Sequence, residues 1–115
     1  MAQSKRMLQY VERYNALKTE LQTIGFLCQC SVQTRWIECG KASCRCHGDR
    51  ENRHGPYHYW TRKVRGKTVG LVLTKNELPL YREWVENNHN LERILRQMRN
   101  VSTRALALTT GRKAP

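Results

Sequence analysis

The sequence has no long hydrophobic run. Its 115 residues contain no stretch of about 18 consecutive apolar residues, the length that a membrane-spanning helix needs. The first residues are charged and lack the apolar segment of about 7 to 15 residues that is typical of a secretory signal. We therefore expect a soluble, unexported protein that is located in the cytoplasm and has no membrane partner.

Acidic residues are scarce, with nine Asp and Glu against 21 Lys and Arg. The acids nearest to the cysteines are Glu38, Asp49 and Glu51, and they form no H-x-E or H-E-x-x-H arrangement of the kind that zinc deaminases and hydrolases use. The chain also has no glycine-rich loop that would cradle phosphate groups. These absences argue against catalysis, and we expect that the protein is not an enzyme.

The scarcity of acids leaves a net charge of +12. Residues 35–75 hold ten basic and three acidic side chains, and therefore more than half of that charge. A positive field attracts polyanions and accelerates encounters with them. We therefore expect a nucleic acid, RNA or DNA, as the partner.

The cysteines are five in number, and an odd number does not suit a disulfide framework. In an unexported protein, clustered cysteines bind metal more often than they form disulfides. Cys39, Cys44 and Cys46 lie close together, and zinc takes four thiolate or imidazole ligands in a tetrahedron. The run therefore predicts a Zn²⁺ site, with Lys41 and Arg45 able to offset the negative charge of the thiolates.

Three histidines, His47, His54 and His58, follow Cys46 within 12 residues. His47 is adjacent to a cysteine, and consecutive side chains rarely point the same way, whereas His58 falls inside a predicted strand. His54 precedes a Gly-Pro turn that can hold its ring, and we expect it as the fourth ligand. His47, His58 and the pair Cys28 and Cys30 remain alternatives. Four protein ligands leave no open position, so the zinc is expected to be structural.

Two amphipathic helices are predicted from residues that recur every three or four positions. The first covers residues 4–24, stops at Gly25 and carries the stripe Met7, Tyr10, Tyr14, Leu17, Leu21 and Ile24. The second covers residues 75–100 and carries the stripe Tyr81, Trp84, Asn88, Leu91, Leu95 and Met98. Its start is marked by Thr74 and Glu77, which have the spacing of a capping box.

The heptad-like stripes allow two arrangements. The helices can pair with each other as an antiparallel hairpin, or with a second copy of the chain as a short coiled coil. Asn88 is either a buried polar group that sets the register or an exposed side chain.

Between the helices, β-branched and aromatic residues predict strands at residues 32–37, 57–62 and 67–73, the last two joined by a turn at Gly66. The expected fold class is therefore α+β. A single zinc-containing domain would occupy residues 1–100, with the strands and the metal loop in residues 31–73. Residues 101–115 are expected to form a flexible tail.

The central segment resembles an uncharacterised prokaryotic family of small basic proteins. The shared pattern is Cys-Gly-Lys from Cys39, Cys-x-Cys from Cys44 to Cys46, and His-Gly-Pro-Tyr from His54, within a resemblance that covers roughly residues 31–98. It implies a zinc knuckle with Cys39, Cys44, Cys46 and His54 at the matched positions, and it implies no activity.

Nucleic-acid contacts are expected from the basic and aromatic residues around the metal loop and the hairpin. The candidates are Arg35, Lys41, Arg45, Arg50, Arg53, Arg62, Lys63, Arg65 and Lys67, with Trp36, Tyr57 and Tyr59 as residues that stack on bases. The expected function is that of a basic, zinc-binding, non-catalytic subunit or regulator of a nucleoprotein complex. The alternative is an assembly factor that forms a homodimer, or docks on a larger protein complex, through its patterned helices.

Overall fold

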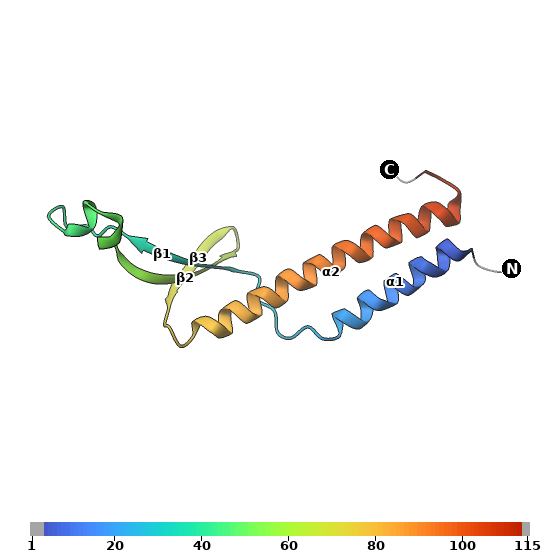
Figure 1. The fold of residues 1–115 in the computed structure, drawn as a ribbon, viewed down its shortest axis with the longest axis horizontal. Helices are drawn as coiled ribbons and strands as arrows, with labels where there is room; N and C mark the ends of the chain where they lie inside the picture. The colour runs from blue at the N-terminus through green and yellow to red at the C-terminus, as the bar shows by residue number, and fades with distance from the viewer. Residues whose placement is uncertain (1–3, 114–115) are drawn as a thin grey trace. The chain divides into compact units, whose positions relative to one another are not determined.

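The computed structural model describes residues 4–113 and has the expected α+β class (Figure 1). In the order of the sequence, one helix precedes a three-stranded sheet and one follows it, and two short 3₁₀ turns lie between the first two strands. The elements in chain order are α1 (Lys5–Leu21), β1 (Ser31–Ile37), η1 (Arg45–His47), η2 (Arg50–Asn52), β2 (His54–Val64), β3 (Lys67–Leu73) and α2 (Leu78–Thr110).

The chain divides into two compact units. The helical unit holds the described residues up to 26 and from 87 onward, and the sheet unit holds residues 27–86. The prediction of a single domain over residues 1–100 stays a prediction. Within the part of the chain that the structure describes, no helix is both long and apolar enough to cross a membrane.

Helix α1 begins at an N-cap, because the hydroxyl of Ser4 accepts a hydrogen bond from the backbone N–H of Met7 at 3.1 Å. All six residues of the predicted stripe are buried or half-buried, and Leu17 is only 1% exposed. The helix ends at Leu21, earlier than predicted. Its last turn tightens, since the N–H of Thr23 bonds to the carbonyl of Glu20 three residues back.

Helix α2 is preceded by the predicted capping box. The N–H of Thr74 donates to the Glu77 carboxylate at 2.9 Å, and the N–H of Glu77 donates to the Thr74 hydroxyl at 3.2 Å. These bonds hold the pKa of Glu77 below its usual range, the backbone bond from Thr74 being the larger cause. The helix proper begins at Leu78 rather than residue 75.

The predicted end of this helix near residue 100 is wrong. The helix continues through residues 101–110, which contain the strong helix formers Ala105 to Leu108. Its Ser and Thr hydroxyls donate to carbonyls one turn back, as Ser102 does to Met98 at 2.8 Å. Gly111, with a φ of 71°, ends it. Residues 114 and 115 of the predicted tail lie outside the described residues.

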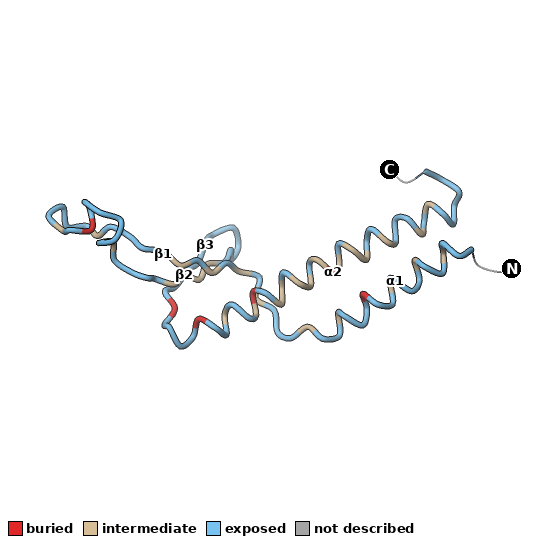
Figure 2. The backbone as a smooth tube through the Cα atoms, viewed as in Figure 1, coloured by how far each residue is buried: buried red, intermediate tan, exposed pale blue. Residues whose placement is uncertain are grey.

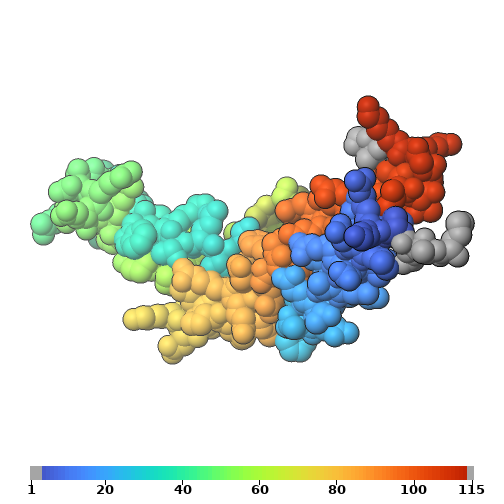
Figure 3. Space-filling view, turned by 45° about the vertical axis from the view of Figure 1, so that its right-hand side comes forward, coloured from blue at the N-terminus to red at the C-terminus, as the bar shows by residue number. Residues whose placement is uncertain are grey.

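In the helical unit the two helices pair as an antiparallel hairpin (Figure 1) and pack closely in the space-filling view (Figure 3). Leu17 and Ile94 are the most buried residues of this unit, at 1% and 0% exposure. Most of the rest of both helices is half-buried or exposed (Figure 2). Ile94 was not in the predicted stripe. Asn88 is half-buried and bonds along its own helix to Glu92.

The sheet unit is an antiparallel sheet in the order β1-β2-β3. The turn between β2 and β3 has Arg65 and Gly66 at its centre, with φ values of 51° and 80°. Two central residues with positive φ make the type I′ turn that suits a two-residue hairpin, which confirms the predicted turn at Gly66.

One face of this sheet is covered by other parts of the same unit. The Trp60 ring meets the Tyr81 ring edge-on with centroids 6.1 Å apart, and the Arg82 guanidinium donates to the Thr34 hydroxyl at 3.1 Å. Leu73 and Leu78 are buried there, at 4% and 8% exposure. The first turns of α2 therefore close one face of the sheet.

Candidate metal centre and basic surface

The loop between β1 and β2 carries all three clustered cysteines. β1 ends at Ile37, β2 begins at His54, and these two residues are paired across the strands. Because antiparallel pairing brings the two ends of the loop together, His54 returns to the region of Cys39.

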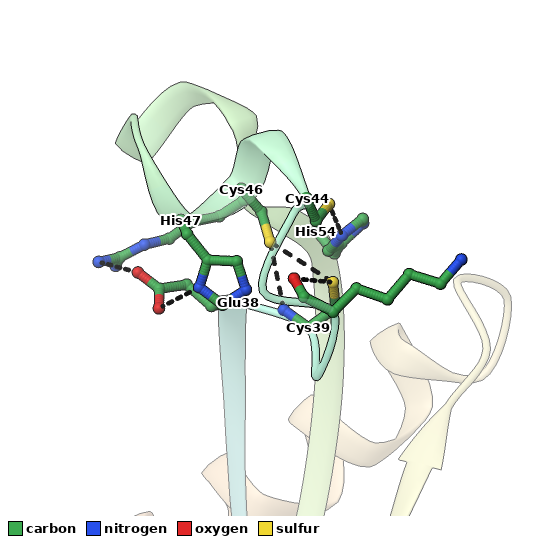
Figure 4. A network of polar contacts seen from close by, with 8 residues as sticks. Glu38, Cys39, Cys44, Cys46, His47 and His54 are labelled. Carbon is green, nitrogen blue, oxygen red and sulfur yellow. Dashed lines mark hydrogen bonds and ion pairs between the residues drawn. The ribbon is translucent and has the colours of Figure 1, made fainter.

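The ligand atoms of Cys39, Cys44, Cys46 and His54 all lie within 4.8 Å of one another. Sγ of Cys44 is 3.3 Å from Nε2 of His54, and Sγ of Cys46 is 3.6 Å from Sγ of Cys39 (Figure 4). Zinc–sulfur and zinc–nitrogen bonds of about 2.3 and 2.0 Å in a tetrahedron place ligand atoms roughly 3.4 to 3.8 Å apart. The four residues thus form a Cys₃His cluster whose spacing suits a structural metal ion.

Tight turns bring the cysteines together within the loop. The N–H of Cys44 donates to the carbonyl of Lys41 at 3.1 Å, and η1 follows at once with Cys46 inside it. The N–H of Cys39 donates to Sγ of Cys46 at 3.2 Å. A backbone N–H directed at sulfur is a typical outer contact of thiolate metal sites.

Two of the thiols have shifted acidity. The pKa of Cys44 is lowered to about 6, first by a hydrogen bond from the backbone of Cys46 and next by the His54 side chain. The pKa of Cys46 is raised, mainly because burial disfavours its thiolate. Without a metal, one of these thiols is therefore ionised at neutral pH while the other keeps its proton.

A second layer of contacts holds the two sides of the cluster. The Glu38 carboxylate accepts from Nδ1 of His47 at 3.1 Å and pairs with the Arg53 guanidinium at 3.7 Å (Figure 4). It thereby joins η1 to the residue just before His54. His58 bonds through Nδ1 to the Thr34 hydroxyl at 2.9 Å. The ring of His54 alone among the three candidate histidines is thus part of the cluster.

Gly55 follows His54 at the start of β2 and lies very close to the backbone of β1. Its φ is 141°, and a Cβ atom there would lie 2.8 Å from the carbonyl oxygen of Arg35 and 3.0 Å from Cδ1 of Trp36. Only glycine accepts both this conformation and this approach. The register shift between Arg35 and Ile37 lies opposite.

Cys28 and Cys30 are not part of the cluster. The structure joins them to each other in a disulfide, a bond that the sequence reasoning did not predict. The alternative that Cys28 or Cys30 is a metal ligand is therefore wrong. C-x-C spacing alone gave no signal that distinguishes a metal pair from a disulfide.

The predicted basic residues fall into separate groups. Arg35, Arg50 and Arg53 gather with Trp36 around a pocket of about 580 Å³, and Trp36 is 54% exposed. Lys41 and Arg45 are exposed in the metal loop. The others lie at or near the β2–β3 hairpin, and they are Arg62, Lys63, Arg65 and Lys67.

The second sheet face is open to solvent. Because alternate residues share a face, Arg35, Tyr57 and Tyr59 lie on it together. The Arg35 guanidinium lies 5.8 Å from the centre of the Tyr59 ring, and the Tyr57 and Tyr59 rings are 6.3 Å apart.

Gln33 and Val72 share this open face, since both are paired with Tyr59. Val72 is 55% exposed. The sequence reasoning missed both residues, although the period of two along the strands would have identified them. We call the surface formed by Gln33, Arg35, Tyr57, Tyr59, Lys63 and Val72 the open face.

A family model described as a domain of unknown function (DUF6788) matches residues 5–87, and the chain belongs to that family. This agrees with the expected membership of an uncharacterised family, while the prokaryotic origin and the zinc knuckle of that family stay predictions. No curated protein and no solved structure matches the chain.

Proposed function

We propose that this protein is a small, basic, zinc-binding protein that binds nucleic acid, RNA or DNA, without acting as an enzyme. We further propose that it serves as a subunit or regulator of a nucleoprotein complex. The observation that carries the proposal is the open face, on which Arg35 lies against the Tyr59 ring beside Tyr57, with the exposed Lys63 further along β2.

The metal part of the proposal rests on the donor set. Three thiolates and one imidazole suit Zn²⁺, and a site filled by four protein ligands is structural. Cys39, Cys44, Cys46 and His54 would hold the ion. Its role would be to fix the loop that carries Arg50 and Arg53, because binding of a structural ion stabilises the folded loop.

The nucleic-acid part rests on the chemistry of the open face. Tyr57 is 36% exposed, and a tyrosine ring on a sheet surface offers a flat face on which an unpaired base can stack. Arg35 and Lys63 on the same face would contact phosphate groups. The face also has the polar side chain of Gln33, which suits a base edge in a groove.

The pocket beside the metal loop adds a second contact. Three arginines and one carboxylate, that of Glu51, line it together with the exposed ring of Trp36. Its net positive charge and its aromatic ring suit one nucleotide with its phosphate. Arg53 is tied to Glu38, which contacts the cluster loop. The metal centre and the basic pocket are thus neighbours in the sheet unit.

The assembly alternative has less support. The helix stripes that would form a coiled coil pack against each other, and Leu17 and Ile94 are buried within one chain. Exposed apolar side chains on the helices, among them Leu8, Val11 and Leu106, are available to a second copy. Light scattering across a concentration series tests this, and a stable dimer with weak, non-saturable nucleic-acid binding would favour it.

The test is a titration of the zinc-loaded protein with labelled duplex DNA, single-stranded DNA and structured RNA across a salt series. We expect saturable binding to at least one of them, with a log-affinity that falls steeply with log-salt. A preference for single strands would indicate stacking, and a preference for duplex DNA would indicate that the sheet enters a groove.

A matched pair of variants separates the open face from net charge alone. Arg35→Gln with Lys63→Gln removes two charges from the open face, and Arg99→Gln with Arg104→Gln removes two exposed charges from α2. We expect the first pair to weaken binding about tenfold or more and the second to weaken it much less. Equal losses, or no saturable binding by the parent protein, would refute the proposal.

A further inference from the structure

Cys28 and Cys30 take no part in the metal centre or in the open face. They are joined by a disulfide across a single intervening residue, and both are half-buried rather than enclosed. A disulfide that a small molecule can reach is open to exchange with a thiol.

The surroundings of the two sulfurs are not equivalent. The indole N–H of Trp60 donates to Sγ of Cys28 at 3.3 Å. The backbone N–H of Cys28 donates to the carbonyl of Trp84 at 3.0 Å, so this residue is held from two sides. A hydrogen bond to sulfur stabilises the thiolate more than the disulfide, because the thiolate carries the charge.

Cys28 also forms part of the wall of a pocket of about 450 Å³ within the sheet unit. Its lining combines aromatic rings with two cations. The residues are Leu27, Cys28, Gln29, Trp60, Arg62, Lys63, Leu80, Tyr81 and Trp84. The Arg62 guanidinium lies 5.4 Å from the centre of the Trp60 ring, the same ring whose N–H contacts Sγ of Cys28.

We propose that Cys28 and Cys30 form a thiol–disulfide exchange site whose co-substrate is a small anionic thiol, one that carries carboxylate groups. The pocket would hold the carboxylates of the thiol at Arg62 and Lys63 and its carbon skeleton against the aromatic rings. Its lining includes Cys28 and Gln29 but not Cys30, so the sulfur of the bound thiol would have to extend past the pocket wall to reach Sγ of Cys30. This proposal does not rest on the proposed binding of nucleic acid, although Lys63 belongs both to the pocket lining and to the open face.

The reaction proceeds in two exchanges. A thiolate attacks Sγ of Cys30 and forms a mixed disulfide, the Cys28–Cys30 bond breaks, and its electron pair leaves on Sγ of Cys28. A second thiolate then attacks the sulfur of the small thiol in the mixed disulfide and releases Cys30 as a thiolate. Two small thiols are oxidised to one small disulfide, the protein disulfide is reduced by two electrons, and both cysteine thiolates take protons from solvent.

Attack falls on Cys30 because Cys28 is the better leaving group. Exchange is faster when the departing sulfur is the more stable thiolate, and the Trp60 N–H provides that stabilisation at Cys28. The mixed disulfide is therefore expected on Cys30.

The first experiment compares two thiols on the zinc-loaded full chain. Reduced glutathione carries carboxylates, and cysteamine carries an ammonium group. Loss of the disulfide is followed by alkylation and peptide mass spectrometry, with rates corrected for the thiolate fraction of each reagent. We expect glutathione to react about tenfold faster, and Arg62→Gln with Lys63→Gln to remove most of that advantage.

Two controls keep the result interpretable. Lys113→Gln with Arg112→Gln removes the same charge from residues outside this pocket and is expected to preserve the advantage of glutathione. Zinc content measured on each sample shows that Cys39, Cys44 and Cys46 are not the source of the signal. Equal rates for the two thiols, or an advantage that survives the pocket substitutions, would overturn the proposal.

The second experiment locates the intermediate. Reactions quenched early with acid are analysed by tandem mass spectrometry of the peptide that contains both cysteines. We expect glutathione on Cys30 in the parent protein, and slower exchange with a reduced preference for Cys30 in Trp60→Phe. Glutathione on Cys28, or a chain whose Cys28 and Cys30 are free thiols even after treatment with oxidised glutathione, refutes the assignment.

Discussion

Ile37 and His54 pair across β1 and β2 and bring the two ends of the cysteine loop together. The three cysteines lie in the loop between these residues, and the pairing returns the imidazole to the thiols. The metal centre is therefore assembled by strand register as well as by local spacing.

Cys46→Ser is expected to abolish zinc binding. Sγ of Cys46 is 3.6 Å from Sγ of Cys39, and the residue is 1% exposed, so its loss removes a ligand and leaves a buried hydroxyl. Cys28→Ser is the control, because Cys28 lies outside the cluster and should leave one zinc per chain. Metal analysis of the purified proteins checks both. Full zinc occupancy in Cys46→Ser would remove this residue from the ligand set.

Glu38→Gln is expected to weaken zinc binding without abolishing it. Its carboxylate contacts His47 and Arg53 on either side of the cluster, and outer contacts of this kind are typically worth about 10- to 100-fold in metal affinity. Both contacts are partly exposed, so we expect the lower end. Glu51→Gln is the charge-matched control. Competition with a chromophoric chelator measures the affinities, and identical values would show that Glu38 does not support the site.

Zinc affinity is expected to rise with pH. Zinc binds thiolates, and the raised pKa of Cys46 keeps that thiol protonated in the metal-free protein at neutral pH. Cys44, with a pKa of about 6, is already ionised there and protonates only in acid. Affinity should therefore fall steeply below pH 6. At neutral pH, calorimetry in two buffers of different ionisation enthalpy should show protons released on binding, and zinc uptake without proton release would contradict this.

The stability of the metal-free protein has a related pH dependence. The folded protein lowers the pKa of Cys44 from 9.0, so the stability from its thiolate is present above about pH 9 and is lost as pH falls toward 6. Cys46 has the opposite sign, since its raised pKa favours the folded state at low pH and this contribution is lost at alkaline pH. Denaturant titrations between pH 9 and pH 6 compare the free energy of unfolding of the parent protein with that of Cys44→Ser, which lacks the Cys44 thiolate.

Gly55→Ala is expected to destabilise the fold by about 2 to 3 kcal/mol. The added Cβ would meet the Arg35 carbonyl oxygen at 2.8 Å, and the φ of 141° is unfavourable for any side chain. Gly40→Ala is the control, because nothing lies within 4 Å of a Cβ there. Urea unfolding measures both, and an equal cost at the two positions would show that the close approach is not the cause.

Much of the fold was predictable because its signals are local. The stripe from Met7 to Ile24, the capping box at Thr74 and the turn at Gly66 each depend on neighbours within a few residues. The end of α2 was mispredicted because small side chains continue the stripe after Met98. Val101 and Ala105 keep the spacing of three and four and are half-buried, and residues 105–108 are strong helix formers.

Composition and short-range spacing specify the α+β class, the clustered thiols and the excess of positive charge, and these were predictable from the sequence. Packing in three dimensions decided that His54 rather than His47 or His58 completes the cluster, that Cys28 pairs with Cys30, and that the helices form a hairpin. It also decided which face of the sheet is left open. These features depend on strand register and on packing between residues distant in the chain, and such contacts leave no periodic trace in the sequence.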